Sequence, residues 1–431
     1  MSELNPSSTR RRHSFPAAAG HDVCASGSPT IPSIARSRCA DGLSRKVYCV
    51  LGMPIDAIDM TDVLQKIEDA AAGSTPFLIS TPNVNFLVTC KSDGDFRESV
   101  LSSDLCPADG MPIVWAARLL GLPIKKRISG ADIFEALKAP RSRRVSVFFF
   151  GGLNGVATKA AQEINTTSAG LICVGSLDPG CGSLDEMSAN ELVDQVNRSG
   201  ADFLAVSLGA KKGQRWLLHN HERLTVPVRA HLGAVVNFQA GTLRRAPSAV
   251  RACGLEWLWR IKEEPNLWRR YAGDGATLIR LLLTRLLPLM SLTLWQRFRW
   301  RACAPELQSN ISRNSDTLLI RLSGLAVEAQ IESMISCFQH ALDMNESHVS
   351  IDLAGVKAVD ARFLGLLILF RKELTKRKKS LSVVRVSRAI ERMFLLNDLK
   401  FLISSGPGEQ SLHRSRTGID QLSLIGTSAA K

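Results

Sequence analysis

Apolar runs alternate with amphipathic stretches between residue 47 and about residue 247. Five of these runs have strand character and are bounded by glycine or polar residues: 76–81, 145–152, 170–176, 201–209 and 228–238. Continuous apolar strands separated by helical stretches are typical of a parallel sheet covered by helices on both faces. The pattern therefore predicts an α/β domain, with ligands expected at the carboxyl ends of its strands.

A second, smaller unit is indicated by the C-terminal pattern. Strand-like runs at 317–324, 347–360 and 380–387 alternate with helical stretches near 327–343, 362–379 and 389–399. This order predicts a compact α/β domain over 317–403. The polar segment 304–316 is expected to be a linker, and the basic stretch 1–46 and the polar residues 404–431 are expected to be disordered tails.

The stretch between the two units, residues 273–303, is rich in leucine and arginine. Residues 276–301 contain five arginines and no acidic residue, and the longest uncharged run, Leu286–Gln296, is shorter than the ~20 residues needed to span a bilayer. We therefore predict an amphipathic helix, broken near Pro288, that lies in a membrane interface. The alternative is a helix packed on the protein's own surface or in an oligomer.

Composition narrows the class of partner. The 431 residues carry a net charge of +14, and the pI is near 9.6, which favours an anionic partner: nucleic acid, an acidic membrane or a phosphorylated substrate. The ten cysteines form no CxxC pair, so neither a zinc site nor a disulfide framework is indicated. A reducing, cytosolic compartment is expected, and no cofactor is indicated.

Polar residues that follow predicted strands are the first candidates for a site. Thr81 and Asn83 come directly after the run 76–81, where their side chains can bind a sugar or phosphate or simply cap the next helix. Asp109 precedes Gly110 in a tight turn, and it is either a general base for an acceptor hydroxyl or an ordinary Asp-Gly turn. Arg127 is a candidate phosphate clamp, with a plain surface arginine as the alternative.

Three further motifs bear on phosphate or metal binding. Residues 243–271 mix six arginines with three tryptophans, which fits either a phosphate clamp at a membrane or the solvated face of an amphipathic helix. The glycine-rich residues 151–155 follow an apolar strand and can cradle phosphates or pack strand against helix. Asp93-Gly94-Asp95 spells a DxD motif, but no apolar strand precedes it, so we interpret it as a surface turn and predict no metal site.

Separated motifs over residues 47–272 resemble the WecG/TagA/CpsF glycosyltransferases, glycosyltransferase family 26. The motifs that carry the resemblance are TPN at 81–83, ADG at 108–110, RxxGxD at 127–132, the FGG loop, Trp216, Gly241, RAP at 245–247, GLEW at 254–257, Arg260, EP at 264–265 and RY at 270–271. The resemblance implies a Rossmann-like transferase domain with a C-terminal helical, membrane-associating appendage. It also implies an inverting transfer of a sugar from a UDP-sugar to a polyprenyl-diphosphate-linked saccharide.

The resemblance also implies roles for single residues. Asp109 falls on the family's proposed catalytic base. Thr81 and Asn83 fall on residues that line the substrate pocket, and Arg245 lies in the RAP motif of the same expected binding set. The arginines implied to hold diphosphate groups are Arg127, Arg260 and Arg270. Fixed guanidinium groups can stabilise the charge that develops on departing UDP.

The chain departs from the family pattern at two places. Gly213 and Gln214 stand where the family commonly has Gln and Glu, and Asn237 stands where it commonly has Asp. Both changes remove negative charge near the expected nucleotide pocket, where we place Gln214 and Asn237. They indicate an altered donor sugar or, alternatively, an inactive protein. Activity is expected because Asp109 and the arginines are retained.

The second unit resembles a STAS domain, the sulphate transporter and anti-sigma factor antagonist fold. The resemblance lies in IDLAGVKAVD at 351–360, whose Asp360 is expected to begin a helix, and in RMFLLNDLKFLI at 392–403. It implies a module that interacts with a protein partner. Ala361 follows Asp360 where regulatory members carry a phosphorylated serine, so we expect no phosphorylation switch.

These expectations combine into one hypothesis with one rival. The first is an enzyme of exopolysaccharide or cell-envelope polysaccharide synthesis, cytoplasmic and peripherally attached to the inner face of the bacterial membrane. Its expected partners are a UDP-sugar, a polyprenyl-diphosphate-linked acceptor, the membrane surface and a protein bound by the STAS-like unit, with no nucleic acid; a homo-oligomer is left open. The rival is a catalytically silent scaffold that binds the lipid-linked sugar.

Overall fold

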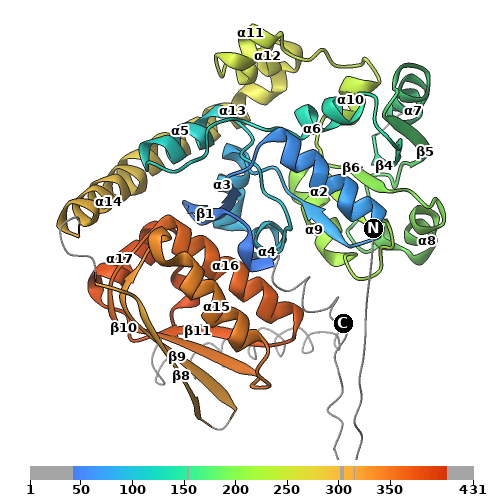
Figure 1. Cartoon of the computed structure of the whole chain (residues 1–431). Helices are drawn as coiled ribbons and strands as arrows, with labels where there is room; N and C mark the ends of the chain where they lie inside the picture. Colours follow the sequence, from blue (N-terminus) through green and yellow to red (C-terminus); the bar gives the residue numbers. More distant parts are fainter. Residues whose placement is uncertain (1–41, 153–154, 301–304, 315, 405–431) are drawn as a thin grey trace, which may run out of the picture.

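The computed structural model describes residues 42–152, 155–300, 305–314 and 316–404, so most of both expected tails lies outside the described residues. Figure 1 shows an N-terminal α/β unit in blue to green, a yellow appendage that continues into a long helix, and a C-terminal unit in orange to red. The predicted fold class, a parallel α/β domain followed by a smaller α/β domain, is confirmed.

The N-terminal unit is built on a five-stranded parallel sheet. Its strand order is β3-β7-β6-β4-β5, with every neighbouring pair parallel. The strand bounds are β3 (Phe77–Ile79), β4 (Val145–Gly151), β5 (Leu171–Leu177), β6 (Phe203–Ser207) and β7 (Val228–His231). The central strands are buried on both faces, which is why their sequences are continuously apolar.

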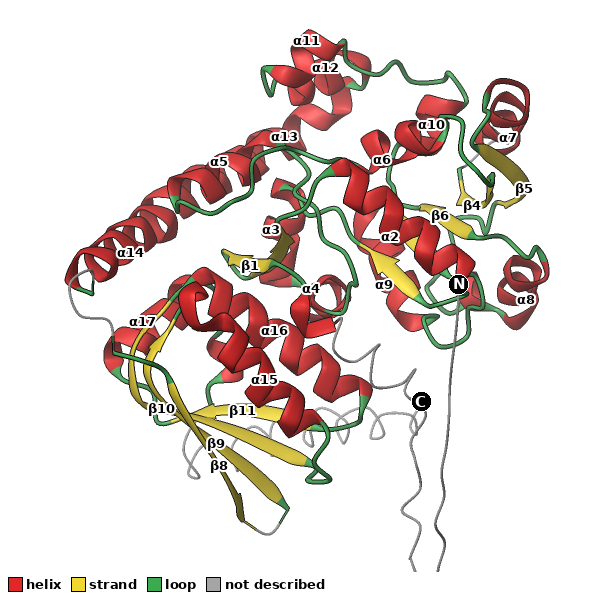
Figure 2. Cartoon of the chain, viewed as in Figure 1, coloured by secondary structure: helices red, strands yellow, loops and turns green. Residues whose placement is uncertain are grey.

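Helices cover both faces of this sheet. One face is covered by α2 (Met60–Ala72), α6 (Gly130–Leu137), α7 (Val156–Thr167) and α10 (Val235–Gln239), whose apolar residues share one core with the strands. The other face is covered by α8 (Asn190–Arg198) and α9 (Ala210–His219), with Trp216 stacked on Phe150 at 4.1 Å between ring centroids. Figure 2 shows these helices around the sheet.

The direction in which successive strands are added to the sheet reverses between β4 and β6. The chain passes from β4 outward to β5 through α7, then returns through α8, on the opposite face, to β6 on the other side of β4. Loops that follow β4 and β6 therefore separate above the carboxyl ends of these strands. Such a switch point is where open parallel sheets bind ligands.

Two local predictions for this unit need correction. The run 228–238 is not one strand: β7 ends at His231, Gly233 has a φ of +54°, and Val235–Gln239 forms α10. The N-terminal unit also contains an antiparallel hairpin of β1 (Val47–Val50) and β2 (Met53–Asp56), which the sequence pattern did not predict. Leu51 and Gly52, both with positive φ, form its turn.

The remaining helices of this unit and the appendage follow the loops after the strands. They are α3 (Val84–Ser92), α4 (Gly94–Leu101), α5 (Met111–Leu119), α11 (Ser248–Ala252), α12 (Glu256–Glu263), α13 (Trp268–Leu281) and α14 (Leu287–Arg299). A π-helical turn, Leu282–Leu286, joins α13 to α14. Figure 1 shows α5 running beside the long helix that α13 and α14 form.

The sequence predicted a break near Pro288, but the long helix continues through this residue. Proline removes a backbone donor and crowds the carbonyl four residues earlier, and the π turn just before it absorbs that misfit without ending the helix. The continuous helix Pro265–Arg299 has the length and apolar composition to cross a membrane, and only 17% of its most apolar window is buried. Whether this helix lies in a membrane interface, as the sequence predicted, or crosses the membrane is therefore not decided by its length and composition.

The C-terminal unit is a four-stranded sheet packed on helices. Its strand order is β11-β10-β9-β8, and its elements are β8 (Gln308–Asn314), β9 (Thr317–Ala326), α15 (Ile331–Leu342), β10 (His348–Val359), α16 (Ala361–Lys376), β11 (Ser380–Val384) and α17 (Arg388–Leu396). Asp360 caps α16 by accepting the Phe363 N–H, as predicted. Residues 308–314, predicted as linker, instead form the edge strand β8, antiparallel to β9.

Candidate active site

The candidate site lies at the edge of the parallel sheet, beyond the carboxyl end of β3. Leu105 forms a parallel bridge with Ile79, so the segment that leads to Asp109 runs beside β3 like a further strand. The Asp109 N–H donates to the Pro82 carbonyl at 2.9 Å, which ties the ADG turn to the TPN turn. The two motifs, far apart in sequence, are thus brought together.

Asn83 serves the helix and the site at once. Its Oδ1 accepts the Phe86 N–H at 3.1 Å and caps α3, as the capping alternative predicted. Its side chain also hydrogen-bonds the Asp109 carboxyl, which favours the ionised form. The cap therefore holds Asn83 in place as a hydrogen-bond partner of Asp109.

The Asp109 carboxyl is a weaker acid than an ordinary aspartate, because its pKa is raised. Desolvation by burial raises the pKa of Asp109 to about 7, with the negative charges of Glu256 and Asp132 adding to the rise and Arg127 opposing it. Gly110, with a φ of +103°, allows the chain to turn directly after it. A carboxyl that changes protonation near neutral pH is suited to accept a proton during a reaction.

Asp132, at the start of α6, gathers arginines from three parts of the chain. Arg127 lies 3.1 Å from one carboxyl oxygen, Arg251 lies 3.2 Å from the other, and Arg245 pairs with the same oxygen as Arg251. Desolvation by burial would raise the pKa of Asp132, but hydrogen bonds from Ser129, which forms a capping box with it, and the charges of the nearby arginines hold this pKa below its usual value. Arg127 also pairs with Glu256.

The arginines are thus held by carboxylates in the ligand-free chain. A diphosphate offers more acceptor oxygens than one carboxylate and can take over part of these contacts. Asp132, Arg251 and Glu256 were not among the candidates chosen from sequence. The capping spacing at 129–132 and the GLEW motif were the signals for two of them, but Arg251 carried no motif.

A cavity lies next to the cluster of Asp132 and its three arginines, called the Asp132 cluster below. A cavity of about 470 Å³ opens between α6, α7 and α10, and Arg245 lines it. Its other charged walls are Lys138 and Lys159, with Glu135 and Glu163 opposite in sign. Arg245 therefore connects the Asp132 cluster to a space of ligand size.

The other predicted binding residues have distinct places. Thr81 is buried, and its methyl group lies 3.8 Å from the position of a Cβ added at Gly130, so it packs at the start of α6. Asn237 is half-buried on α10, and its carbonyl accepts the Thr242 N–H. Both lie on elements that border the cluster or the cavity.

Gln214 does not fit its predicted role. Its side chain is fully buried, and its Oε1 accepts from Ser80 Oγ at 3.2 Å and Ser99 Oγ at 3.1 Å. It lies on the face of α9 that packs toward α4. This placement opposes a substrate contact, and it does not explain the missing carboxylate, because Oε1 is the atom that is hydrogen-bonded whereas the buried Nε2 has no partner among the described residues.

The neighbouring departure, Gly213, also has a packing reason. A Cβ at Gly213 would lie only 2.3 Å from Cδ2 of His231, which is itself buried and hydrogen-bonded to the Leu208 carbonyl at 2.7 Å. Gly213 therefore makes room for His231 at the end of β7.

Arg260 and Arg270 do not join the arginines that pair with Asp132. Arg260 pairs with Glu264 at 2.6 Å and lies over the Phe238 ring, 5.6 Å from its centroid. Arg270 lies over the Tyr271 ring at 5.0 Å. Arg260 therefore touches α10 beside the cavity, while Arg127–Glu256 and the two arginines on Asp132 form the ion pairs that fasten the appendage to the site.

The DxD motif is the start of a helix and not a surface turn. Asp93 is buried, caps α4 by accepting the Phe96 N–H, and pairs with Lys211 at 2.8 Å and Arg215 at 3.2 Å. Asp95 is exposed in the first turn and pairs with Arg215. Within the described part of the chain, no group of three or more His, Cys, Asp or Glu side chains is placed to hold a metal ion.

Comparison with known proteins gives two family matches. Residues 48–291 match the model described as "Glycosyl transferase WecG/TagA/CpsF family", and residues 309–403 match "Mlab, STAS domain". The C-terminal unit is therefore a STAS domain, as its sequence suggested. Similar solved structures are an anti-sigma factor antagonist from Mycobacterium paratuberculosis (16% identity, 26% of this chain, 95% of that chain, TM-score 0.23) and phosphorylated SpoIIAA from Bacillus (17%, 26%, 100%, TM-score 0.21).

Two curated relatives are both named N-acetylglucosaminyldiphosphoundecaprenol N-acetyl-beta-D-mannosaminyltransferase. The protein from Bacillus spizizenii is 30% identical over 196 residues, which are 43% of this chain and 74% of the relative. The protein from Bacillus subtilis is 26% identical over 195 residues, 45% of this chain and 74% of the relative. With a family model that spans more than half of its length, the chain belongs to the WecG/TagA/CpsF glycosyltransferase family.

Proposed function

We propose that this glycosyltransferase moves a sugar from a UDP-sugar to a polyprenyl-diphosphate-linked sugar, with Asp109 as the base. The names of the two relatives describe an acceptor of this kind, and the arginines around Asp132 suit diphosphate groups. The observation that carries the proposal is the Asp109 carboxyl, whose pKa is raised to about 7 beside Arg127. Synthesis of exopolysaccharide or another envelope polysaccharide is the setting we propose.

The chemical step is a single displacement. The acceptor hydroxyl oxygen attacks the anomeric carbon, Asp109 takes the hydroxyl proton, and UDP departs with the electrons of the broken C–O bond. This inverts the anomeric centre. Arg127 and Arg245, which pair with Asp132 in the ligand-free chain, would exchange this carboxylate for the departing diphosphate and neutralise its charge.

Transfer of radiolabel from UDP-sugars to a polyprenyl-diphosphate acceptor tests the proposal. Asp109→Asn is expected to lower kcat by roughly a hundredfold to ten-thousandfold, the usual contribution of a general base. Asp95→Asn is the matched control, because this exposed aspartate forms an ion pair with Arg215 of α9, outside the candidate site, and it should keep wild-type activity. Absence of transfer by the wild type with every donor, together with retained binding of the lipid-linked sugar, would support the silent scaffold instead.

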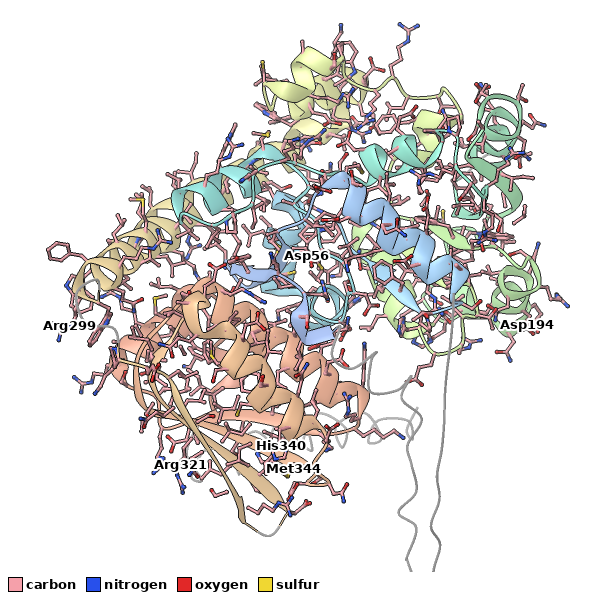
Figure 3. All side chains as sticks on the ribbon, in the orientation of Figure 1. Asp56, Asp194, Arg299, Arg321, His340 and Met344 are labelled. Atoms are coloured by element: carbon pink, nitrogen blue, oxygen red, sulfur yellow. The ribbon has the colours of Figure 1, made fainter. Side chains whose placement is uncertain are left out.

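We further propose that the protein attaches to the inner face of the cytoplasmic membrane through the long helix. Its outward stripe is apolar and exposed: Ile279, Leu283, Leu287, Leu294, Trp295 and Phe298. Arg299 lies at the far end of this helix in Figure 3, where it can reach lipid phosphates. Trp115 and Leu119 on α5, which runs beside this helix in Figure 1, are also exposed.

An interfacial position is favoured over a membrane-spanning one by the helix's other face. Leu281, Leu286 and Leu289 are buried in the protein core, and Arg285 pairs with Asp398 at 3.1 Å. A helix that crossed the bilayer would lose these contacts. The protein should therefore be extracted from membranes by alkaline carbonate, whereas a spanning helix would stay in the pellet.

Binding to anionic vesicles tests the lipid contact directly. Trp295→Ser with Phe298→Ser should weaken binding tenfold or more, because burying each large apolar side chain contributes about 1.5–3 kcal/mol. Ile172→Ser removes an exposed apolar residue from β5, far along the chain from this helix, and should leave binding unchanged.

A further inference from the structure

The STAS domain is packed into the transferase domain rather than tethered beside it. Apolar residues of β1, β2, α4, α16 and α17 belong to one continuous core. The approach is close: a Cβ at Gly365 of α16 would lie 2.2 Å from the Val47 carbonyl oxygen, and Arg362 donates to the same oxygen at 3.1 Å. Tyr48 donates to Glu328, and Lys91 pairs with Asp398 across the same boundary.

One part of this boundary is the segment that carries Asp109. Between Ser103 and Asp109 the backbone is hydrogen-bonded on several sides. The Leu105 N–H donates to the Leu78 carbonyl at 3.2 Å, Cys106 exchanges hydrogen bonds with Asp56, and the Ile128 N–H donates to the Ala108 carbonyl at 2.8 Å. The position of Asp109 depends on these contacts, since it follows them directly.

Asp104 lies near the start of this segment, and its carboxylate forms an ion pair with a lysine of the STAS domain. One carboxyl oxygen of Asp104 accepts the Leu78 N–H of β3 at 2.9 Å, and the other accepts from Lys372 of α16. Lys372 is 7% exposed, and its pair with Asp104 joins α16 to the segment. Lys376, half-exposed, lies 3.7 Å from the same oxygen and is a weaker second partner.

The neighbouring support comes from the transferase domain alone. Arg45 pairs with Asp56 at 2.7 Å and also donates to the Ser103 carbonyl at 3.1 Å. Figure 3 labels Asp56 in the N-terminal unit, close to the orange C-terminal unit. The segment is therefore held by two buried ion pairs, of which one crosses the domain boundary.

We propose that Lys372 is a positioning residue for sugar transfer, which makes the STAS domain a built-in support of the transferase site. The buried Lys372 ammonium fixes Asp104, Asp104 fixes the register of its segment against β3, and the segment presents Asp109 to the acceptor. The catalytic part of this inference rests on the proposed role of Asp109. A carboxylate left buried without its cation is strongly destabilised, so losing Lys372 should loosen the segment locally.

Three full-length variants test the inference. Lys372→Met removes the charge and keeps most of the volume, and Lys372→Arg keeps the charge. Arg371→Gln is the control, because it removes a neighbouring ion pair of α16 with Glu98, which lies on α4 and outside the segment. Each is assayed for kcat and donor KM well below its melting temperature. Amide hydrogen exchange over residues 103–110 is measured in parallel, because it needs no activity.

The expected pattern separates positioning from general stability. Lys372→Met should lower kcat about tenfold, leave the donor KM within about twofold, and speed exchange over 103–110 about tenfold, whereas Lys372→Arg and Arg371→Gln should leave both readouts near wild type. Unchanged kcat and protection in Lys372→Met, or an equal loss in Arg371→Gln, would overturn the inference. If the wild type transfers no sugar but Lys372→Met still exchanges faster than the wild type over 103–110, the coupling between the STAS domain and this segment stands and the proposed function is rejected.

Discussion

Replacing Glu256 by glutamine is expected to move the acid limb of sugar transfer to lower pH. Asp109 must be ionised to accept a proton, and its pKa is raised to about 7, so the wild-type rate should fall about tenfold per pH unit below pH 7. Glu256 contributes to this raised pKa by its negative charge, and it also holds Arg127 by an ion pair. The substitution removes the charge and releases the arginine, and both effects lower the pKa of Asp109.

The size of the shift follows from simple electrostatics. A unit charge ~6 Å away at an effective dielectric constant of ~40 contributes about 1.4 kcal/mol, or about one pKa unit. With the midpoint lowered from about pH 7 to about pH 6, the ionised fraction of Asp109 at pH 6 rises from about 0.09 to about 0.5. Relative to its own plateau, the variant should then be about fivefold more active at pH 6 than the wild type.

The assay is kcat/KM for transfer between pH 5 and pH 9, each profile normalised to its plateau. Normalisation matters because Glu256 also fastens the appendage, so the plateau itself can fall. Glu264→Gln is the matched control: it removes a carboxylate of the same appendage, paired with Arg260, and should leave the midpoint unchanged. A Glu256→Gln midpoint at or above that of the wild type would refute the assignment of this limb to Asp109.

Two further predictions concern stability. Gly365→Ala should lower the melting temperature by several degrees, because its Cβ would overlap the Val47 carbonyl oxygen. Gly273→Ala is the control: open space surrounds this residue on α13, so the substitution should be neutral or stabilising by up to about 1 kcal/mol. Similar melting temperatures for the two variants would contradict the tight domain boundary. Since the folded-state pKa of Asp109 is raised, its favourable contribution to stability is present below the unfolded pKa and is lost as pH rises through about 7, so Asp109→Asn should gain more in melting temperature at pH 8 than at pH 4. Equal gains at both pH values would argue against a raised pKa.

The sequence pattern was informative where each element buries a continuous apolar run. The strands β4 and β6 and the helix α16 carry such runs, and their positions follow from composition and period alone. The strand β8 is different, because its sequence QSNISRN is polar, and its place at a sheet edge depends on pairing with β9. Pairing of this kind is not encoded in a local period.

The site was predictable in part for the same reason. Asn83 follows β3 and Asp109 follows the segment that runs parallel to β3, so the topology of a parallel sheet is enough to bring them together. The pairing of Arg245 and Arg251 with Asp132 joins segments more than a hundred residues apart, which no spacing reveals. Gln214 could have been assigned to the core, because it lies one helical turn from buried Leu217 on α9.

The packing of α16 on β1 has a consequence for the order in which this chain can fold. A ribosome delivers β1 first, and the helix that covers it is made more than three hundred residues later. Until then the hairpin of β1 and β2 lacks much of its cover, and its apolar side chains are open to chaperones or to wrong partners. Completion of the transferase domain therefore coincides with the synthesis of the STAS domain, and a chain that stops before residue 361 would leave the first strand of the enzyme uncovered.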